Sequence, residues 1–144
     1  MNFTRAIGWI TKLGFSQQRK TLGERGELAA AKYLRRTGYR IVTTRLRHRY
    51  GEVDIIALDG RTVVFVEVKT RRLDLTTQPA EAVDANRQRR LTHAALAFLK
   101  GHGLLEYASR FDVMEVVWPD GEKTPKIRHI IDAFPAVGKG QMYH

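Results

Sequence analysis

The sequence predicts one α/β domain in which helices flank a central mixed sheet, in the order helix, three-strand meander, helix and two strands. Three observations support this class. The 144 residues, 43% of them hydrophobic, are enough for one buried core. Apolar residues recur at helical spacing in two segments and alternate along several others. No repeat or linker divides the chain, so we expect a domain over residues 20–137 between an N-terminal amphipathic arm (1–19) and a flexible tail (138–144).

Two long helices are predicted from apolar residues at intervals of three and four. The first covers residues 21–36, and Gly38 is well placed to end it. The second runs from near Pro79, a suitable first helical residue, to Lys100, and Gly101 ends it. A shorter amphipathic pattern in the N-terminal arm indicates a segment that packs on the domain or on a second subunit.

Glu27 is an acidic residue on the inward face of the first predicted helix. It precedes Ala30 and Leu34 by three and seven positions, so its carboxylate points along the face that should be buried. A salt bridge to Arg47 or Arg49 would explain an acid at this position, and a functional role would explain it as well.

Five strands are predicted where β-branched and aromatic residues gather between turn signals. Asp59-Gly60 is a strong hairpin turn between the second and third strands, and Pro119-Asp120-Gly121 joins the last two. The third and fourth strands flank the second helix and can form a right-handed crossover, which makes the sheet mixed. The five strands cover residues 39–47, 52–58, 62–70, 111–118 and 126–131.

The charge balance favours a polyanionic partner. The chain has 25 Lys and Arg against 15 Asp and Glu, a formal net charge of +10, and such a field attracts nucleic acid. With no cysteine, a metal site must use carboxylates, carbonyls, water or histidine, which favours a hard ion. No segment is long and apolar enough for a membrane span, so we expect a cytoplasmic protein without membrane contact.

Charged residues gather on the hairpin strands GEVDIIAL and TVVFVEVKT, at the end far from their turn. Alternation places Asp54, Glu67 and Lys69 on one face. A two-residue loop of Asp59-Gly60 or of Gly60-Arg61 preserves that shared face, and the second loop sets Asp54 opposite Glu67. The other face is predicted to be wholly apolar, with the members Val53, Ile55, Ala57, Val64, Val66 and Val68.

This pattern predicts a divalent metal site. Carboxylates a few ångströms apart repel one another in a half-buried site unless a cation joins them. Oxygen ligands from Asp54 and Glu67 suit Mg²⁺ or Mn²⁺. Lys69 would then orient a water or stabilise charge on a phosphate. Alternatively, Glu67 and Lys69 are exposed edge-strand charges and Asp54 pairs with an arginine; glycoside hydrolysis is disfavoured by the lysine and the basic field.

The same residues resemble the PD-(D/E)XK nuclease superfamily, whose core is an acid on one strand followed by an acid, a spacer and a lysine on the next. Over residues 20–134 the segments RGELAAAKYLRRTGYRIV, GEVDIIALDGRTVVFVEVKTRR, PAEAVD, QRRL and RFDV resemble the YraN family of bacterial proteins, which is similar to archaeal Holliday junction resolvases. The resemblance implies a restriction-endonuclease-like fold, metal ligation by Asp54 and Glu67, catalysis with Lys69 and Glu27, and a possible homodimer.

Three features of the sequence each allow two interpretations. Superfamily members often add Gln or Lys from the helix after the lysine strand; Gln88 is the nearest candidate, whereas Arg87 fits the inward positions of that helix better. Basic residues at 45–49, 69–72 and 87–90 would follow phosphates or form solvated surfaces. The predicted function is metal-dependent hydrolysis of phosphodiester bonds in DNA or RNA, and the alternative is a non-catalytic nucleic-acid-binding module with the same fold.

Overall fold

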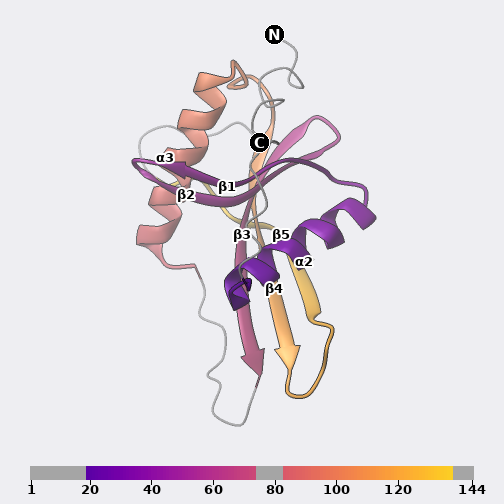
Figure 1. The fold of residues 1–144 in the computed structure, drawn as a ribbon. Coiled ribbons are helices and arrows are strands. Elements are labelled where there is room, and N and C mark those ends of the chain that lie inside the picture. Colours follow the sequence, from indigo (N-terminus) through magenta and orange to yellow (C-terminus); the bar gives the residue numbers. More distant parts are fainter. Residues whose placement is uncertain (1–18, 74–82, 138–144) are drawn as a thin grey trace.

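The computed structural model describes residues 19–73 and 83–137. The predicted order of helix, three strands, helix and two strands is confirmed. Residues 1–18 of the predicted arm, the predicted tail and the helix start near Pro79 lie outside the described residues. The elements are α2 (Leu22–Arg36), β1 (Arg40–His48), β2 (Gly51–Asp59), β3 (Thr62–Leu73), α3 (Ala85–Gly101), β4 (Ser109–Pro119) and β5 (Lys126–Phe134) (Figure 1).

The five strands form one mixed sheet in the order β1-β2-β3-β4-β5. β3 and β4 are parallel, which requires a crossover connection, and α3 lies in that connection; all other neighbours are antiparallel. Asp59 pairs with Thr62, so the hairpin loop is Gly60-Arg61, the second of the two loops considered from the sequence. Gly60 has a φ of +59°, which suits a glycine in this turn.

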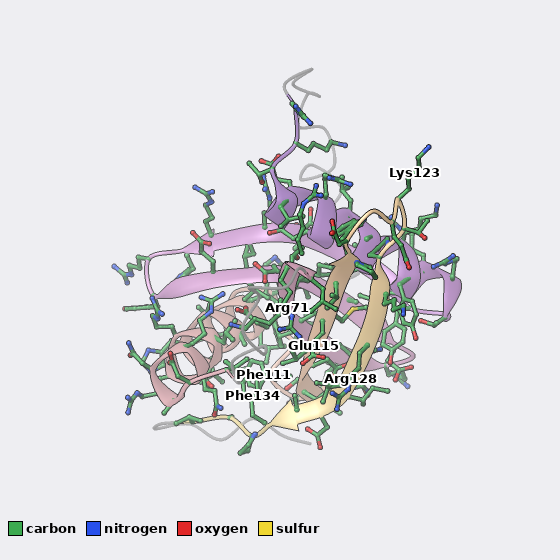
Figure 2. All side chains as sticks on the ribbon, turned by 90° about the horizontal axis from the view of Figure 1, so that it is seen from below. Arg71, Phe111, Glu115, Lys123, Arg128 and Phe134 are labelled. Carbon is green, nitrogen blue, oxygen red and sulfur yellow. The ribbon has the colours of Figure 1, made fainter. Side chains whose placement is uncertain are left out.

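The two helices cover opposite faces of the sheet (Figure 2). On the α3 face, Phe65 contacts both Phe98 and Phe111, and Phe111 stacks on Phe134 with ring centroids 4.9 Å apart (Figure 2). On the α2 face, Ala30, Ala31 and Leu34 of the helix pack on a second apolar cluster. The central strands are therefore buried on both sides, as a sheet between two helix layers requires.

The β1–β2 hairpin bends away from β3, β4 and β5 (Figure 1). The pairing of β2 with β3 ends at Ile55 and Val66. Val53 then packs with Ile56 on the α3 face, whereas Ile55 and Ala57 lie on the α2 face. The predicted apolar face that joined Val53 to Ile55 and Ala57 is therefore wrong, because the β1–β2 hairpin bends away from β3 beyond Ile55.

Both helices begin at side-chain caps. The Thr21 hydroxyl accepts from the Glu24 amide of α2, and the Glu24 carboxylate accepts from the Thr21 amide. Asp84 caps α3 by accepting from the Arg87 amide at 2.7 Å. Val83 and Asp84 are not helical, so the predicted continuous helix from near Pro79 is wrong at these two residues. Among the described residues no helix is long and apolar enough to cross a membrane.

Candidate active site

Asp54 lies where β2 separates from β3. In this gap the two backbones no longer pair, and Oδ2 of Asp54 accepts a hydrogen bond of 2.8 Å from the backbone amide of Val68. The side chain therefore replaces the missing strand partner and satisfies a backbone donor of β3. This contact fixes the carboxylate beside the segment that carries Glu67 and Lys69.

The charged form of Asp54 is disfavoured in this position. Burial, and then the negative charge of Glu67, raise the pKa of Asp54 from 3.8 to about 7, and Glu27 adds to the rise. The hydrogen bond from Val68 and the charge of Arg87 oppose the shift without cancelling it. Asp54 is thus close enough to two other acids to be affected by their charges and lacks a sufficient positive counterpart.

Glu67 is a buried acid of β3, with 7% of its surface exposed. Arg87 of α3 donates to both of its oxygens, from Nε to Oε1 at 3.2 Å and from Nη2 to Oε2 at 2.8 Å. The Nζ of Lys69 lies 3.9 Å from Oε1 of the same carboxylate. A fork of this kind neutralises a buried carboxylate and fixes its orientation.

Glu27 reaches the site from α2. Its Oε2 accepts from Nε of Arg45 at 2.8 Å, and Nη2 of Arg45 also lies 3.1 Å from Glu24. The partner of Glu27 is therefore Arg45; the predicted bridges to Arg47 or Arg49 are not formed. Arg45 has a φ of +55°, an uncommon backbone conformation for a residue other than glycine, at the position in β1 beside Asp54.

The predicted residues lie in one region, but they interact with one another in different ways. Asp54 and Glu67 interact through their charges, Lys69 contacts Glu67, and Glu27 acts on Asp54 through its field. Arg87, rather than Gln88, is the α3 residue that reaches this region. The Gln88 amide instead donates to the backbone carbonyl of Val83 at 2.8 Å.

The Asp54 and Glu67 carboxylates suit a hard divalent ion. Magnesium typically binds through one or two carboxylates together with waters and substrate phosphate. Burial and the charge of Glu67 raise the pKa of Asp54, so a cation beside this carboxylate would favour its charged form. Within residues 19–73 and 83–137 no group of three or more His, Cys, Asp or Glu side chains could hold a metal, so the pair would need water or substrate to complete the coordination.

Basic residues continue from this region along α3 to the β1–β2 turn. Arg90 of α3 is exposed, and its backbone lies so close to Gly51 that a Cβ there would be 2.8 Å from the Arg90 carbonyl oxygen. Next to it, the ring of His93 contacts Tyr50, and the guanidinium of Arg49 lies over the same ring at 4.9 Å. The turn and the helix therefore present their cations side by side.

A second polar cluster, which the sequence analysis missed, surrounds Asp112 on the α2 face. The fully buried Asp112 carboxylate accepts from Arg110 at 3.0 Å and from the Asp132 amide at 2.9 Å, and lies 2.7 Å from Nε2 of His129. Residues 131–133 of β5 form an irregularity opposite Asp112. Charged residues two apart, Arg110 and Asp112 in the RFDV segment, were the available signal for a buried ion pair.

Comparison with known proteins places the chain in a family. The model of the uncharacterised protein family UPF0102 matches residues 26–116. The UPF0102 protein of Rhodopirellula baltica is 44% identical over 99% of this chain and 95% of its own length. That of Geobacter sulfurreducens is 49% identical over 83% and 92%. The solved structure of Hjc, a Holliday junction resolvase from Archaeoglobus fulgidus, aligns with 82% of this chain and 84% of its own at 16% identity and a TM-score of 0.39. The family match and the coverage of both relatives lead to one conclusion: this chain belongs to the UPF0102 family.

Proposed function

We propose that this protein is a metal-dependent endonuclease that hydrolyses phosphodiester bonds in DNA or RNA. The observation that carries the proposal is the partly neutralised acid pair Asp54 and Glu67, in which the pKa of Asp54 is raised to about 7, with Lys69 3.9 Å from Glu67. Acids with perturbed pKa values beside a lysine, here where β2 separates from β3, are typical of catalytic sites. The order of an acid followed by Glu67-Val68-Lys69 on the adjacent strand resembles the PD-(D/E)XK nucleases.

In this proposal each side chain has a defined task. Asp54 and Glu67 would hold Mg²⁺ or Mn²⁺, and the bound ion would supply Lewis-acid polarisation of the phosphate and a water of lowered pKa. Lys69 would orient the attacking water and offset the charge that develops on the phosphate. Glu27 of α2 holds the side chain of Arg45 beside Asp54. The exposed arginines of β1 and α3 bind neighbouring phosphates and position the strand.

A cleavage assay tests the proposal. Labelled DNA and RNA in single-stranded, duplex and branched forms are incubated with the purified protein and Mn²⁺. Glu67→Ala and Lys69→Ala are expected to lower the cleavage rate by ~100-fold or more, as removal of a charge-stabilising group does in other enzymes. Lys126→Ala, which removes an exposed lysine at the start of β5, is the matched control. A Lys69→Ala protein that cut as fast as the Lys126→Ala protein would refute the mechanism.

The arginine fork on Glu67 favours a second candidate, a nucleic-acid-binding module without catalysis. Arg87 already neutralises one of the two acids, as it would in a purely structural ion pair. The two candidates differ in metal binding. Calorimetric titration with Mn²⁺ should give a saturable isotherm that Asp54→Asn removes if the protein is an enzyme of the proposed kind, whereas a binding module needs no such site.

A further inference from the structure

Arg87 occupies the carboxylate that the proposed function assigns to the metal. Both Glu67 oxygens accept from the guanidinium, at 3.2 and 2.8 Å. The pair is largely buried, with 19% of the Arg87 side chain and 8% of the Glu67 side chain exposed. Solvent screens such a pair weakly, so the guanidinium and a second cation at the same oxygens would repel each other strongly.

The other charged side chains around Glu67 already have partners. Nε of Arg45 lies 2.8 Å from Oε2 of Glu27, and Nζ of Lys69 lies 3.9 Å from Oε1 of Glu67. Asp54 accepts a hydrogen bond of 2.8 Å from the Val68 amide, and no salt bridge to its carboxylate forms within residues 19–73 and 83–137. A divalent ion placed between Asp54 and Glu67 would satisfy Asp54 but would leave Arg87 as an excess positive charge. Arg87 then needs a different anion.

A phosphodiester is the anion that fits Arg87 best. The planar guanidinium presents paired donors that match two phosphate oxygens as well as they match a carboxylate. Arg87 lies in the first turn of α3, where its own amide is held by Asp84 at 2.7 Å, so the backbone stays in place while the side chain changes partner. The basic surface of α3 and the β1–β2 turn would bring phosphates to this position.

We infer that Arg87 is a switch residue that binds Glu67 in the free protein and transfers to a substrate phosphate when a divalent ion takes Glu67. This inference rests on the proposed function and adds to it a mechanism of coupling. Because the metal must displace Arg87 from Glu67, and a phosphate gives the displaced guanidinium a new partner, metal and nucleic acid bind more tightly together than separately. By linkage, each increases the affinity of the other by the same factor.

Titration calorimetry with Mn²⁺ alone at pH 8 tests the competition between Arg87 and the metal. Arg87→Ala and Arg87→Gln remove the competing charge, and Gln keeps an amide donor for Glu67 if the Ala variant folds poorly. We expect these variants to bind Mn²⁺ about tenfold more tightly than the parent, within the usual range of coupling between two sites. Arg89→Ala, on the exposed side of the same helix, is the control for the loss of one positive charge.

A second measurement follows the side chain directly. The Nε–H signal of Arg87 in the ¹⁵N spectrum, assigned by its loss in Arg87→Gln, should shift and exchange faster with water when Mg²⁺ is added to the parent. Adding a short DNA duplex with Mg²⁺ should protect the signal again, because the phosphate replaces Glu67 as its partner.

The outcomes separate this inference from the proposed function. Equal Mn²⁺ affinity in the parent, Arg87→Gln and Arg89→Ala, with binding still dependent on Asp54, would overturn the switch and leave the metal site standing. An Arg87 signal that does not respond to saturating Mg²⁺ would overturn it as well. If none of the proteins binds Mn²⁺ in a saturable way, the proposed function itself fails and the switch fails with it.

Discussion

Asp54 is held where its charged form is disfavoured. Burial and the charge of Glu67 raise its pKa to about 7, so the folded protein binds this proton more tightly than the unfolded chain does. The stability contributed by the proton is complete below the ordinary value of 3.8 and is lost as the pH rises through about 7. At pH 8 the folded protein therefore contains an unfavourable charge.

Asp54→Asn is expected to stabilise the protein at pH 8 without metal. The Asn oxygen can still accept from the Val68 amide, and the repulsion with Glu67 disappears. We expect the free energy of unfolding in EDTA to rise by roughly 1–3 kcal/mol at pH 8, with little difference at pH 4. Urea denaturation at both pH values measures this. Asp120→Asn, at an exposed turn, is the control, and an equal effect of both substitutions would contradict the argument.

Asp112 is the opposite case, a buried acid whose charge stabilises the fold. Burial raises its pKa, but hydrogen bonds with His129, Arg110 and the Asp132 amide outweigh burial and hold the pKa below 3.8. Its contribution is complete above pH 3.8 and is lost as the pH falls through the lower pKa of the folded state. The Asp112 carboxylate also fixes the irregular segment of β5, because it accepts a hydrogen bond from the backbone amide of Asp132, which has a φ of +53°.

Asp112→Asn should therefore destabilise the protein by about 3–5 kcal/mol at pH 7, because it leaves the buried charge of Arg110 without its main partner. Asp59→Asn is a matched control: Asp59 also binds Arg110, at 3.0 Å, but its side chain is 51% exposed. The control should cost at most about 1 kcal/mol. Chemical denaturation compares the two, and similar losses would show that the buried position of Asp112 is not what matters.

At the residue scale, the two-residue length of the hairpin loop predicted that Asp54 and Glu67 would share one face of the strands, because side chains alternate along a strand. The loop length could not predict that the side chain of Asp54 lies in the gap between β2 and β3, since this depends on where the β1–β2 hairpin bends away from the sheet. Whether Arg87 or Gln88 reaches the site likewise depends on how α3 is turned against the sheet. Two neighbours on a helix differ by about 100° in direction, and the cap at Asp84, which was not predicted, sets where the helix begins.

At the scale of elements, α2 packs unusually close to β3 at Gly26. A Cβ at this position would overlap the side chain of Thr70, which follows Lys69 in β3. The absence of a side chain at Gly26 therefore lets α2 approach the strand and places the next residue, Glu27, beside the acid pair. The contact between Gly26 and Thr70 therefore both packs α2 on the sheet and positions Glu27.

Substitution by alanine at two glycines of α2 tests the close approach. Gly23→Ala has open space, with its nearest neighbour 3.9 Å away, and should stabilise the protein by up to ~1 kcal/mol through helix propensity. Gly26→Ala gains the same propensity but forces α2 away from Thr70, for a net loss of roughly 1–3 kcal/mol. Thermal unfolding measures both. Equal stabilisation by the two substitutions would mean that the helix shifts without cost.

The elements themselves were largely predictable because hydrophobic period and turn residues act locally. The helix over residues 21–36 and all five strands agree with the structure to within a few residues. The errors have long-range causes. Val53 lies on the α3 face because the β1–β2 hairpin bends away from the rest of the sheet. The irregularity in β5 lies opposite the buried Asp112 of β4, which is far from the turn that joins these two strands.

At the scale of the whole molecule, the formal net charge of +10 acts on any polyanion. The cations are not spread evenly around the site. Arg47, Arg49, Arg89 and Arg90 are exposed on β1, the β1–β2 turn and α3, and contacts between Gly51 and Arg90 and between Tyr50 and His93 join these elements. A nucleic acid that reaches Glu67 would therefore lie on a basic surface built by two separate segments.

Binding to nucleic acid is accordingly expected to depend strongly on salt. Each neutralised phosphate of a duplex contributes about −0.9 to the slope of log K against log salt concentration, so three or four contacts give a slope of roughly −3. Fluorescence anisotropy with a labelled duplex in EDTA, from low to moderate salt, measures the slope. Arg47→Ala combined with Arg90→Ala should make it shallower by up to about 2. Lys123→Ala combined with Lys126→Ala removes the same charge from the β4–β5 turn and the start of β5, and should leave the slope nearly unchanged. Figure 2 shows Lys123 in this turn. If both double variants weaken binding equally, net charge alone attracts the nucleic acid and the surface formed by β1 and α3 does not orient it.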